Sequence, residues 1–387
     1  MVVNYEFLGS EPIENVITCL HFKIDKVVFF GYHEEIREQK NKTENFLRQY
    51  CGVREVIFQP LYPNDLQAIL RTMRSAIERE LDSGAKLFFD ITGGESLILV
   101  AFGILSKQYD TSMHIYDVPK NQLIELDDGA GSRISRDAEA QHVELDLDKY
   151  VEMHGGKINY LLQKSLKEIS DEEFDRDVAG IWEVASRFSD QWNPFSDFLR
   201  AHMVPDEDLQ VNRKATTILH ALSESKGKLT TPAKLNQILD ALAEKGVILD
   251  LKHEDGEYRL RFKNQYIKEC LWDGGSILEW HVFQEERRTS GDCRIGVHLD
   301  WDGIVHSQAG VDVLNEIDVL SLTGCVPTFI SCKSGEMASR QTLHALYELD
   351  TVAKRFGGKY AKKVLVTTKG LSDVYLERAA EMGIEVR

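Results

Sequence analysis

The chain has 387 residues, of which 43% are hydrophobic and 28% are charged, and its formal net charge is −17. A chain of this length predicts two or three globular domains with ordinary apolar cores, because one domain holds roughly 100–200 residues. The negative charge argues against a protein that coats nucleic acid through bulk electrostatics.

The same bulk features bear on where the protein works. The longest apolar run, Leu97–Leu105, is far shorter than the about 20 residues that span a membrane, and the first residues lack the basic and apolar segments of a signal peptide. The six cysteines form no CxxC pair and are expected to be reduced thiols. We therefore expect a cytoplasmic protein without a membrane partner.

The first 120 residues alternate between strand and helix patterns. The run at 26–32 is almost continuously apolar, as in a strand that is buried on both faces. In chain order, strands are expected at 4–10, 26–32, 53–59, 86–94 and 112–118, with helices at 34–50, 64–82 and 95–108. This alternation predicts a doubly wound, Rossmann-like α/β domain with a parallel sheet over residues 1–145.

The next segment is polar and acidic. Helices are expected at 149–168 and 172–190, which we interpret as a connector. Residues 211–262 have the pattern of a small winged helix, in which two helices precede two alternating runs, and Asp255-Gly256 between the runs is typical of a hairpin. The helices carry few basic residues, so a spacer or dimer element is favoured over DNA binding. We assign residues 146–262 to a helical connector and this winged-helix-like unit.

Residues 263–387 have the pattern of a second α/β domain. A helix capped by Ser276 is expected to run to about Arg288. Further strands are expected at 294–301, 311–322, 327–335, 362–368 and 383–387, with helices at 338–356 and 371–382.

Charged side chains gather on the predicted strands of this domain. Asp318 lies in one strand, Lys333 lies in the next strand after a hairpin, and Glu279 lies on the preceding helix. Glu316 and Asp318 are two residues apart and share one face of their strand, as do Ser331 and Lys333. Carboxylates bind Mg²⁺ or Mn²⁺, which can activate water for phosphodiester cleavage beside a lysine. The spacing equally allows a cross-strand ion pair without catalysis.

The stretch NEIDVLSLTGCVPTFISCKSG, residues 315–335, resembles the core of the PD-(D/E)xK restriction-endonuclease-like superfamily. It is more closely similar to the CRISPR-associated nucleases that join a CARF sensor domain to such a nuclease domain. The resemblance implies that residues 263–387 are the nuclease domain, with Mn²⁺ or Mg²⁺ as the cofactor. It also implies that Glu279, Asp318 and Lys333 are the metal-site and catalytic residues.

The chain departs from the superfamily at one position. Ser331 stands where the superfamily usually carries an acidic residue, two residues before the lysine. A serine cannot supply the missing negative charge. The resemblance therefore implies that Glu279 or Glu316 substitutes as a metal ligand, that the Cys332 carbonyl joins the metal, or that activity is weaker.

A basic run follows these residues. Between residues 354 and 369 the chain carries several lysines and an arginine but no acidic residue. A local basic face can follow a nucleic-acid backbone although the net charge is negative, and a solvated helix end is the equal alternative. The nucleic-acid-binding candidates are Lys354, Arg355, Lys359, Lys362 and Lys363.

Three predicted loops follow strand ends in the N-terminal domain. Ligands of open α/β sheets bind beyond the carboxyl ends of the strands, where glycines allow close approach and helix N-termini offer N–H groups to phosphate. A plain tight turn would leave the same pattern. Neither a Walker A sequence nor GxGxxG occurs, which argues against ATP hydrolysis and classical NAD binding. The ligand-binding candidates are Gly9, Ser10, Glu11, Gly31, Tyr32, His33, Thr92, Gly93, Gly94, Glu95 and Ser96.

The turn DITGGES, residues 90–96, resembles the strand-four loop of CARF domains, which sense the cyclic oligoadenylates of type III CRISPR immunity. These domains usually carry a threonine and a lysine after the two glycines, where this chain has Glu95 and Ser96. The resemblance implies a homodimer with the ligand across its two-fold axis, and cyclic tetra-adenylate is the expected activator.

Together the motifs predict a cyclic-oligoadenylate-activated, metal-dependent nuclease in type III CRISPR antiviral defence. The substrate implied by the resemblance is single-stranded DNA or RNA. The alternative is a CARF-type transcriptional regulator that binds DNA and carries an inactive nuclease fold, which Ser331 favours. A third hypothesis is that the N-terminal domain also degrades its own activator.

Overall fold

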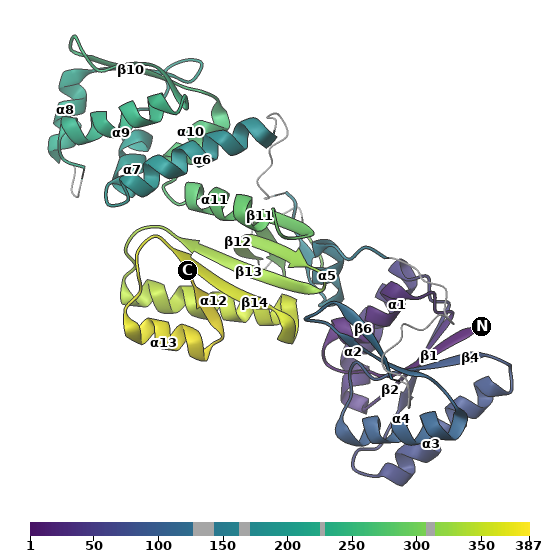
Figure 1. The fold of residues 1–387 in the computed structure, drawn as a ribbon. Coiled ribbons are helices and arrows are strands. Elements are labelled where there is room, and N and C mark those ends of the chain that lie inside the picture. Colours follow the sequence, from purple (N-terminus) through teal and green to yellow (C-terminus); the bar gives the residue numbers. More distant parts are fainter. Residues whose placement is uncertain (127–142, 162–170, 225–228, 307–313) are drawn as a thin grey trace.

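The computed structural model describes residues 1–126, 143–161, 171–224, 229–306 and 314–387, and these residues form three units (Figure 1). Two of the units are built on six-stranded sheets and one on a three-stranded sheet.

The N-terminal unit has the strand order β3-β2-β1-β4-β5-β6. The ladders among β1 to β5 are parallel, and β6 is antiparallel to β5. The predicted doubly wound parallel sheet is confirmed, while β6 is an edge strand that the sequence patterns did not indicate. The strands are β1 (Val2–Phe7), β2 (Lys26–Gly31), β3 (Glu55–Pro60), β4 (Lys86–Asp90), β5 (Met113–Asp117) and β6 (Gln122–Leu126).

Helices cover both faces of this sheet. They are η1 (Pro12–Asn15), α1 (Ile17–His21), α2 (His33–Tyr50), α3 (Leu66–Leu81) and α4 (Ser96–Tyr109). Because β1 neighbours both β2 and β4, the strand order reverses beside β1. In open α/β sheets this reversal opens a crevice at the carboxyl ends of the strands, where ligands bind.

Helix α4 is apolar on more than one side. Ile98 and Phe102 are buried against the sheet, whereas Val100 and Ile104 are 50% and 40% exposed. An exposed apolar face of this kind marks a surface that a partner can cover. Within the described ranges, no helix is both long and apolar enough to cross a membrane.

The C-terminal unit has the strand order β15-β14-β13-β12-β11-β7. Strands β11, β12 and β13 form an antiparallel meander, and β14 and β15 extend it in parallel with β13. The strands are β7 (Lys157–Ile158), β11 (Asp292–Asp300), β12 (Leu314–Thr323), β13 (Val326–Lys333), β14 (Lys362–Thr367) and β15 (Ile384–Val386). The helices are α10 (Gln265–Trp272), α11 (Ser276–Glu286), α12 (Ser339–Gly357), η2 (Gly358–Tyr360) and α13 (Asp373–Glu381).

Residues 311–313 of the strand predicted at 311–322 lie outside the described residues. The predicted helix at 149–168 is wrong. Helix α5 (Leu147–Met153) ends early, and β7 joins the edge of the C-terminal sheet beside β11. Gly155 and Gly156 turn the chain between them: Gly155 has a φ of +81°, and a Cβ on Gly156 would lie 2.2 Å from Phe356 Cε1. Residues 162–168 of the predicted helix lie outside the described residues.

The middle unit joins helices to a small antiparallel sheet with the order β8-β10-β9. Asp255 and Gly256 have φ values of +58° and +78°, which is the backbone of the two-residue hairpin turn predicted there. The elements are α6 (Asp171–Arg187), α7 (Trp192–His202), β8 (Gln210–Lys214), α8 (Ala215–Glu224), α9 (Pro232–Glu244), β9 (Ile248–Lys252) and β10 (Glu257–Phe262).

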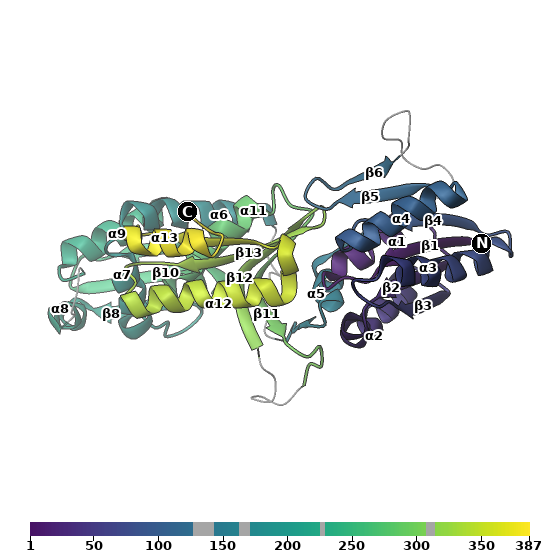
Figure 2. The ribbon, with the colours of Figure 1, turned by 90° about the horizontal axis from the view of Figure 1, so that it is seen from below.

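The C-terminal unit lies between the other two in space, as Figure 1 and Figure 2 both show. One apolar cluster runs from the N-terminal unit through α5 into the C-terminal sheet and includes Leu20, Tyr150 and Phe356. A second cluster joins the middle unit to the other face of the C-terminal sheet. The predicted connector therefore does not separate the outer α/β units, which contact each other directly.

Candidate functional site

Asp318 is the centre of a polar cluster on the C-terminal sheet. The β12–β13 ladder ends at the pair Val319 and Ile330. Beyond this pair, the Cys332 N–H donates to the Asp318 side chain instead of to a backbone carbonyl of β12. Its Oδ2 atom accepts hydrogen bonds from the Ser331 hydroxyl at 3.1 Å, the Cys332 N–H at 2.6 Å and the Lys333 ammonium at 3.5 Å. The structure thus brings Asp318 and Lys333 together, and Ser331 supports the carboxylate.

The two oxygens of Asp318 have different surroundings. The Asp318 side chain is 14% exposed, and its three hydrogen bonds all end on Oδ2. Among the described residues, no hydrogen bond to Oδ1 is found. A carboxylate that is fixed through one oxygen can offer the other to a ligand.

Glu279 approaches this cluster from the first turn of α11. A Cβ built on Gly275 would lie 3.8 Å from Ser334 Oγ and 4.0 Å from Glu279 Oε1. Glu279 therefore lies near the segment that directly follows Lys333. The predicted cap at Ser276 is wrong, because the helix is capped by Gly275 and the Ser276 hydroxyl donates to Asp273 Oδ2 at 2.9 Å.

Glu316 and Cys332 have other contacts. Glu316 lies opposite His298 in the β11–β12 ladder, and its Oε2 lies 3.7 Å from His298 Nε2. The Cys332 side chain is buried in the core that faces the middle unit. Asp318 thus lies beside Lys333, Glu279 lies near Ser334, and Glu316 lies close to His298.

The donors suit a hard divalent cation. In the described part of the chain, no three His, Cys, Asp or Glu side chains gather in an arrangement that could hold a metal. Mg²⁺ needs fewer protein ligands than three, because it keeps several waters and usually binds one or two carboxylates together with substrate phosphate. Asp318 and Glu279 are carboxylates of the kind that Mg²⁺ binds, since all their donor atoms are oxygens.

The basic run predicted to follow nucleic acid is partly neutralised. Lys354 and Lys363 both bind Asp350, at 2.7 and 2.8 Å. Although burial raises it, the hydrogen bonds from these lysines hold the pKa of Asp350 below its usual range. Lys362 remains exposed. Asp350 thus offsets the charge of two members of the run, and nucleic-acid binding by this run stays a prediction.

The other two residues of the run lie at the contact with the N-terminal unit. Arg355 donates to the backbone carbonyls of His154, Gly155 and Trp301. The Lys359 ammonium lies 2.7 Å from Glu14 Oε1. Lys359 thus joins the two outer units, while Arg355 joins the turn after α5 to the end of β11.

Glu11 and Glu14 provide the other side of this contact. The Lys359 N–H donates to Glu11 Oε2 at 2.8 Å, and the Tyr360 hydroxyl donates to Glu14 Oε1 at 2.6 Å. Both carboxylates are buried, at 7% exposure each. The Glu11 carboxylate therefore faces the C-terminal unit, and ligand binding by Glu11 stays a prediction.

The remaining ligand-binding candidates converge at one edge of the N-terminal sheet. The Tyr32 hydroxyl, after β2, donates to Glu95 Oε2, before α4, at 3.0 Å. A Cβ on Gly94 would lie 3.5 Å from Phe7 Cβ at the end of β1. The loops after β1, β2 and β4 therefore meet as predicted. Gly9 and Ser10 lie in the first of these loops, Gly31 is the last residue of β2, and His33 is the first residue of α2.

Within the β4 loop, only part of the turn is open to a ligand. The Thr92 hydroxyl accepts the Tyr116 N–H at 2.9 Å and so faces β5. Gly94 has a φ of +131°, a backbone conformation that favours glycine. Gly93 lies against Glu14, because a Cβ there would be 3.3 Å from Glu14 Oε2. The glycine backbone and the start of α4 at Ser96 are the remaining anion-binding elements.

Two buried carboxyl groups, Glu6 and Asp90, lie beneath this loop. Burial and the nearby Asp90 carboxylate raise the pKa of Glu6 well above its ordinary value. Although burial raises the pKa of Asp90, His114 and the hydroxyl of Thr18 lower it, so Asp90 is the charged member of the pair. The Thr92 N–H also donates to Asp90 Oδ1 at 2.8 Å. Asp90 therefore fixes the turn that carries the two glycines.

Residues 268–387 match the family model of the Card1-like endonuclease domain. The C-terminal unit is thus similar to the Card1-like endonuclease domain and is called the Card1-like domain below. The Card1-like domain contains all the catalytic candidates, from Glu279 to Lys333. No curated protein matches the chain.

Solved structures share the fold of the whole chain. Protein VC1899 from Vibrio cholerae aligns with a TM-score of 0.68 and 16% identity, covering 100% of this chain and 93% of that one. Can2 from Sulfobacillus thermosulfidooxidans, solved in complex with cyclic tetra-adenylate, aligns with a TM-score of 0.65 and 14% identity over the same shares. At this identity the likeness shows the fold alone.

A third structure is a type III CRISPR defence DNA nuclease activated by cyclic oligoadenylate. It aligns with a TM-score of 0.50 and 14% identity, covering 98% of this chain and 51% of that chain. The fold of the whole chain therefore has counterparts among solved structures, and the predicted fold class is confirmed.

Glu14 and the contact that it makes were missed at the sequence level. Glu14 and Tyr360 are separated by 346 positions, and no local pattern links them. The pairing of Lys354 with Asp350 could have been predicted from the sequence, because the two residues are four apart on one helix.

Proposed function

We propose that the chain is a metal-dependent nuclease that a cyclic oligoadenylate activates in type III CRISPR defence. The observation that carries the proposal is the Asp318 cluster with Lys333 inside the Card1-like endonuclease domain. The fold likeness to Can2 in complex with cyclic tetra-adenylate supports an activator of that class at the N-terminal unit.

Asp318 and Glu279 would hold Mg²⁺ or Mn²⁺ in the active site. When bound, the cation stabilises charge on the phosphate and lowers the pKa of a coordinated water. The Lys333 ammonium, 3.5 Å from Asp318 Oδ2, is placed to stabilise negative charge on a phosphate oxygen. The Ser331 hydroxyl and Cys332 N–H hold Asp318 in position. Ser331 would thus orient the metal ligand Asp318 and would not bind the metal itself.

The activator would bind where the loops after β1, β2 and β4 meet. The start of α4 and the Gly93-Gly94 backbone offer N–H groups and space to a phosphate. Ser96 stands where the CARF family usually has a lysine, and the neighbouring Glu95 carboxylate accepts a hydrogen bond from Tyr32. Binding would therefore depend on backbone amides more than on a cationic side chain.

A homodimer would bring two such loop sets around one ring-shaped ligand. Support comes from the exposed apolar side of α4, where Val100 and Ile104 lie one helical turn apart. Gly103, between them, has no side chain and faces open space, since nothing lies within 4 Å of a Cβ built there. A symmetric ligand suits an isologous interface of this kind.

Activation requires that the ligand favours one arrangement of the two units. Glu14 offers a direct route, because it lies against Gly93 and also binds Lys359 and Tyr360 of the Card1-like domain. Phosphate groups at Gly93 would repel the Glu14 carboxylate. The ligand would thereby weaken this contact and shift the population of unit arrangements.

The test is a cleavage assay with labelled single-stranded DNA and RNA, Mn²⁺ and cyclic tetra-adenylate, with ligand-free and EDTA controls. We expect cleavage only when metal and ligand are both present, and the two substrates report which nucleic acid is preferred. Asp318→Asn should abolish cleavage, whereas Glu377→Gln, at an exposed carboxyl on α13, should not. Cleavage by Asp318→Asn at the wild-type rate would refute the proposed site.

The regulator with an inactive nuclease fold is the second candidate, favoured by Ser331 in place of an acidic residue. Under that alternative the wild type would cleave neither substrate. The ligand would instead raise the temperature of unfolding and change the affinity for duplex DNA in a gel-shift assay.

A further inference from the structure

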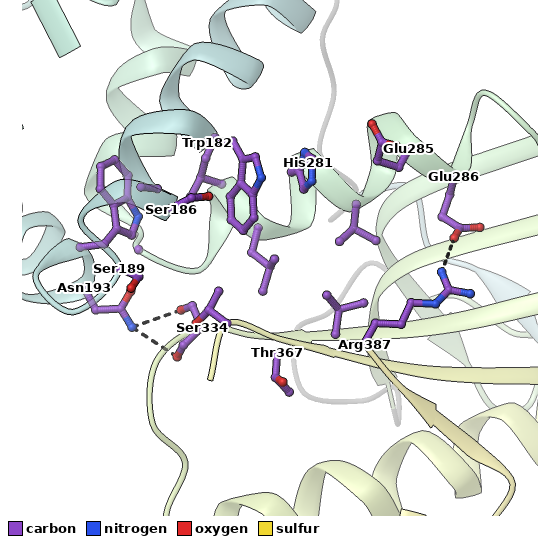
Figure 3. A pocket seen from close by; sticks show the side chains of 18 residues that line it. Trp182, Ser186, Ser189, Asn193, His281, Glu285, Glu286, Ser334, Thr367 and Arg387 are labelled. Atoms are coloured by element: carbon purple, nitrogen blue, oxygen red, sulfur yellow. Dashed lines mark hydrogen bonds and ion pairs between the residues drawn. The ribbon is translucent and has the colours of Figure 1, made fainter. Parts of the chain in front are cut away.

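A cavity of about 530 Å³ lies between α6, α11 and the end of β14 (Figure 3). This volume is in the range of small-molecule sites, which is roughly 300–1,000 Å³. Figure 3 shows Trp182 and His281 on the helical side, and Ser334 and Thr367 on the side of the sheet. The cavity belongs to both the middle unit and the Card1-like domain, and none of the predicted site residues line it.

One wall of the cavity is aromatic. Trp182 and His281 are stacked, with ring centroids 4.4 Å apart and an angle of 13° between the planes. Burial lowers the pKa of His281, which favours the neutral ring. Trp192 also lines the cavity, and among the described residues its buried indole N–H has no hydrogen-bond partner. A flat ligand with a polar edge would match such a wall.

The charges of the cavity do not suit a phosphate. The one arginine of the lining, Arg387, is neutralised by Glu286 at 3.0 Å. Glu285 adds a further carboxylate to the wall. The cavity therefore favours an uncharged ring over an anion, since an anion would meet like charge without a free cation.

The cavity adjoins the candidate catalytic cluster. Ser334, which lines it, directly follows Lys333, and the Thr368 N–H donates to the Lys333 carbonyl at 3.2 Å. Asn193 of α7 holds Ser334 through hydrogen bonds of 3.3 Å to its carbonyl and 3.2 Å to its hydroxyl. A strand whose phosphate lies at Lys333 can therefore place a neighbouring group here.

We propose that this cavity binds a nucleobase of the single-stranded substrate, packed against Trp182 beside the phosphate that is cut. This inference rests on the proposed nuclease function and adds a binding subsite to it. Bases with π-faces stack on aromatic side chains regardless of sequence, so the subsite would require a base without selecting one. It would also favour single strands, because a paired base cannot leave its stack without cost.

The test compares a short single strand that carries bases with an abasic strand of the same length. Binding is measured by fluorescence anisotropy in EDTA, which separates binding from cleavage, with cyclic tetra-adenylate present. DNA and RNA strands are used in parallel. The variants are Trp182→Ala, Trp182→Phe and, as an aromatic control elsewhere, Tyr347→Ala, which removes a ring that is 46% exposed on α12.

We expect the wild type to bind the base-carrying strand about 5- to 150-fold more tightly than the abasic strand, which corresponds to one base stacked on one aromatic side chain. Trp182→Ala should lose most of this preference, while Trp182→Phe and Tyr347→Ala should keep it. Trp182→Phe retains a ring, so a loss confined to Trp182→Ala with an unchanged unfolding temperature separates stacking from misfolding.

Two results would overturn the subsite: no preference for bases in the wild type, or the same preference in Trp182→Ala. The nuclease function is judged separately, by cleavage of the base-carrying strand in Mn²⁺. Cleavage without a role for Trp182 would leave the nuclease standing and remove the subsite. A preference for bases that depends on Trp182, without any cleavage, would support the subsite and remove the nuclease function.

Discussion

Replacing Glu14 by glutamine tests the contact between the N-terminal unit and the endonuclease domain. The Glu14 side chain is 8% exposed and accepts hydrogen bonds from Tyr360 and Lys359 at 2.6 and 2.7 Å. Burial and the hydrogen bond to Glu14 raise the pKa of Tyr360, so the phenol keeps its proton and donates. Glutamine keeps the shape of the side chain and removes only the charge.

The magnitude follows from the two partners. A hydrogen bond to a charged group contributes about 1.5–3 kcal/mol and a neutral one about 0.5–1.5, so the bond from Tyr360 loses about 1 kcal/mol. The Lys359 side chain is 56% exposed. Solvent screening therefore limits that ion pair to at most about 1 kcal/mol. A total of about 1–2 kcal/mol changes an equilibrium by roughly 5- to 30-fold.

The assay is ligand-free cleavage together with the concentration of cyclic tetra-adenylate that gives half-maximal activity. Glu14→Gln should raise ligand-free cleavage by roughly 5- to 30-fold and lower the half-maximal concentration, because the ligand no longer has to weaken this contact. Glu34→Gln, which alters an exposed glutamate of α2, is the control. Unchanged activation, or lower activity in a folded variant, would refute the coupling through Glu14.

Three further predictions concern stability and assembly. Glu6→Gln should stabilise the protein at about pH 8, and the gain should shrink toward about pH 5 in denaturant unfolding, because the raised pKa of buried Glu6 makes the wild type lose stability as pH rises above 4.5. Gly156→Ala should cost about 2–3 kcal/mol in the same assay, because its Cβ would overlap Phe356, whereas Gly370→Ala, with nothing within 4 Å, should cost less than about 0.5. Ile104→Glu should convert a dimer to monomers in sedimentation experiments, since it places charge on the exposed apolar side of α4; a monomeric wild type would contradict this reasoning.

The longer elements could be predicted from the sequence because their patterns are local. The β2 strand is buried along its whole length, and its apolar run indicated this directly. The edge strands β6 and β7 could not be predicted in the same way. β7 has only two residues, Lys157 and Ile158, and its conformation is set by the neighbouring strand β11. Tertiary contacts thus make the segment after α5 a strand, although its sequence pattern is helical.

In the candidate site, too, local contacts could be predicted from the sequence and long-range contacts could not. Asp318 and Lys333 lie on two strands joined by a short turn, so a hairpin was enough to bring them together. The partners of the basic run could not all be predicted, because a charge pattern does not show which acids lie opposite each cation. Lys359 meets Glu14 only through the packing of distant units.

The apolar cluster shared by the outer units has a consequence for cooperativity. Tyr150 of α5 and Phe356 of α12 belong to the same buried cluster as Leu8 and Ile17 of the N-terminal unit. Separating the two units from each other would expose these side chains to water, at a cost of about 25 cal/mol for each Å² of apolar surface. The two units should therefore melt in a single transition. A ligand held only by the N-terminal loops would then raise the melting temperature of the endonuclease as well.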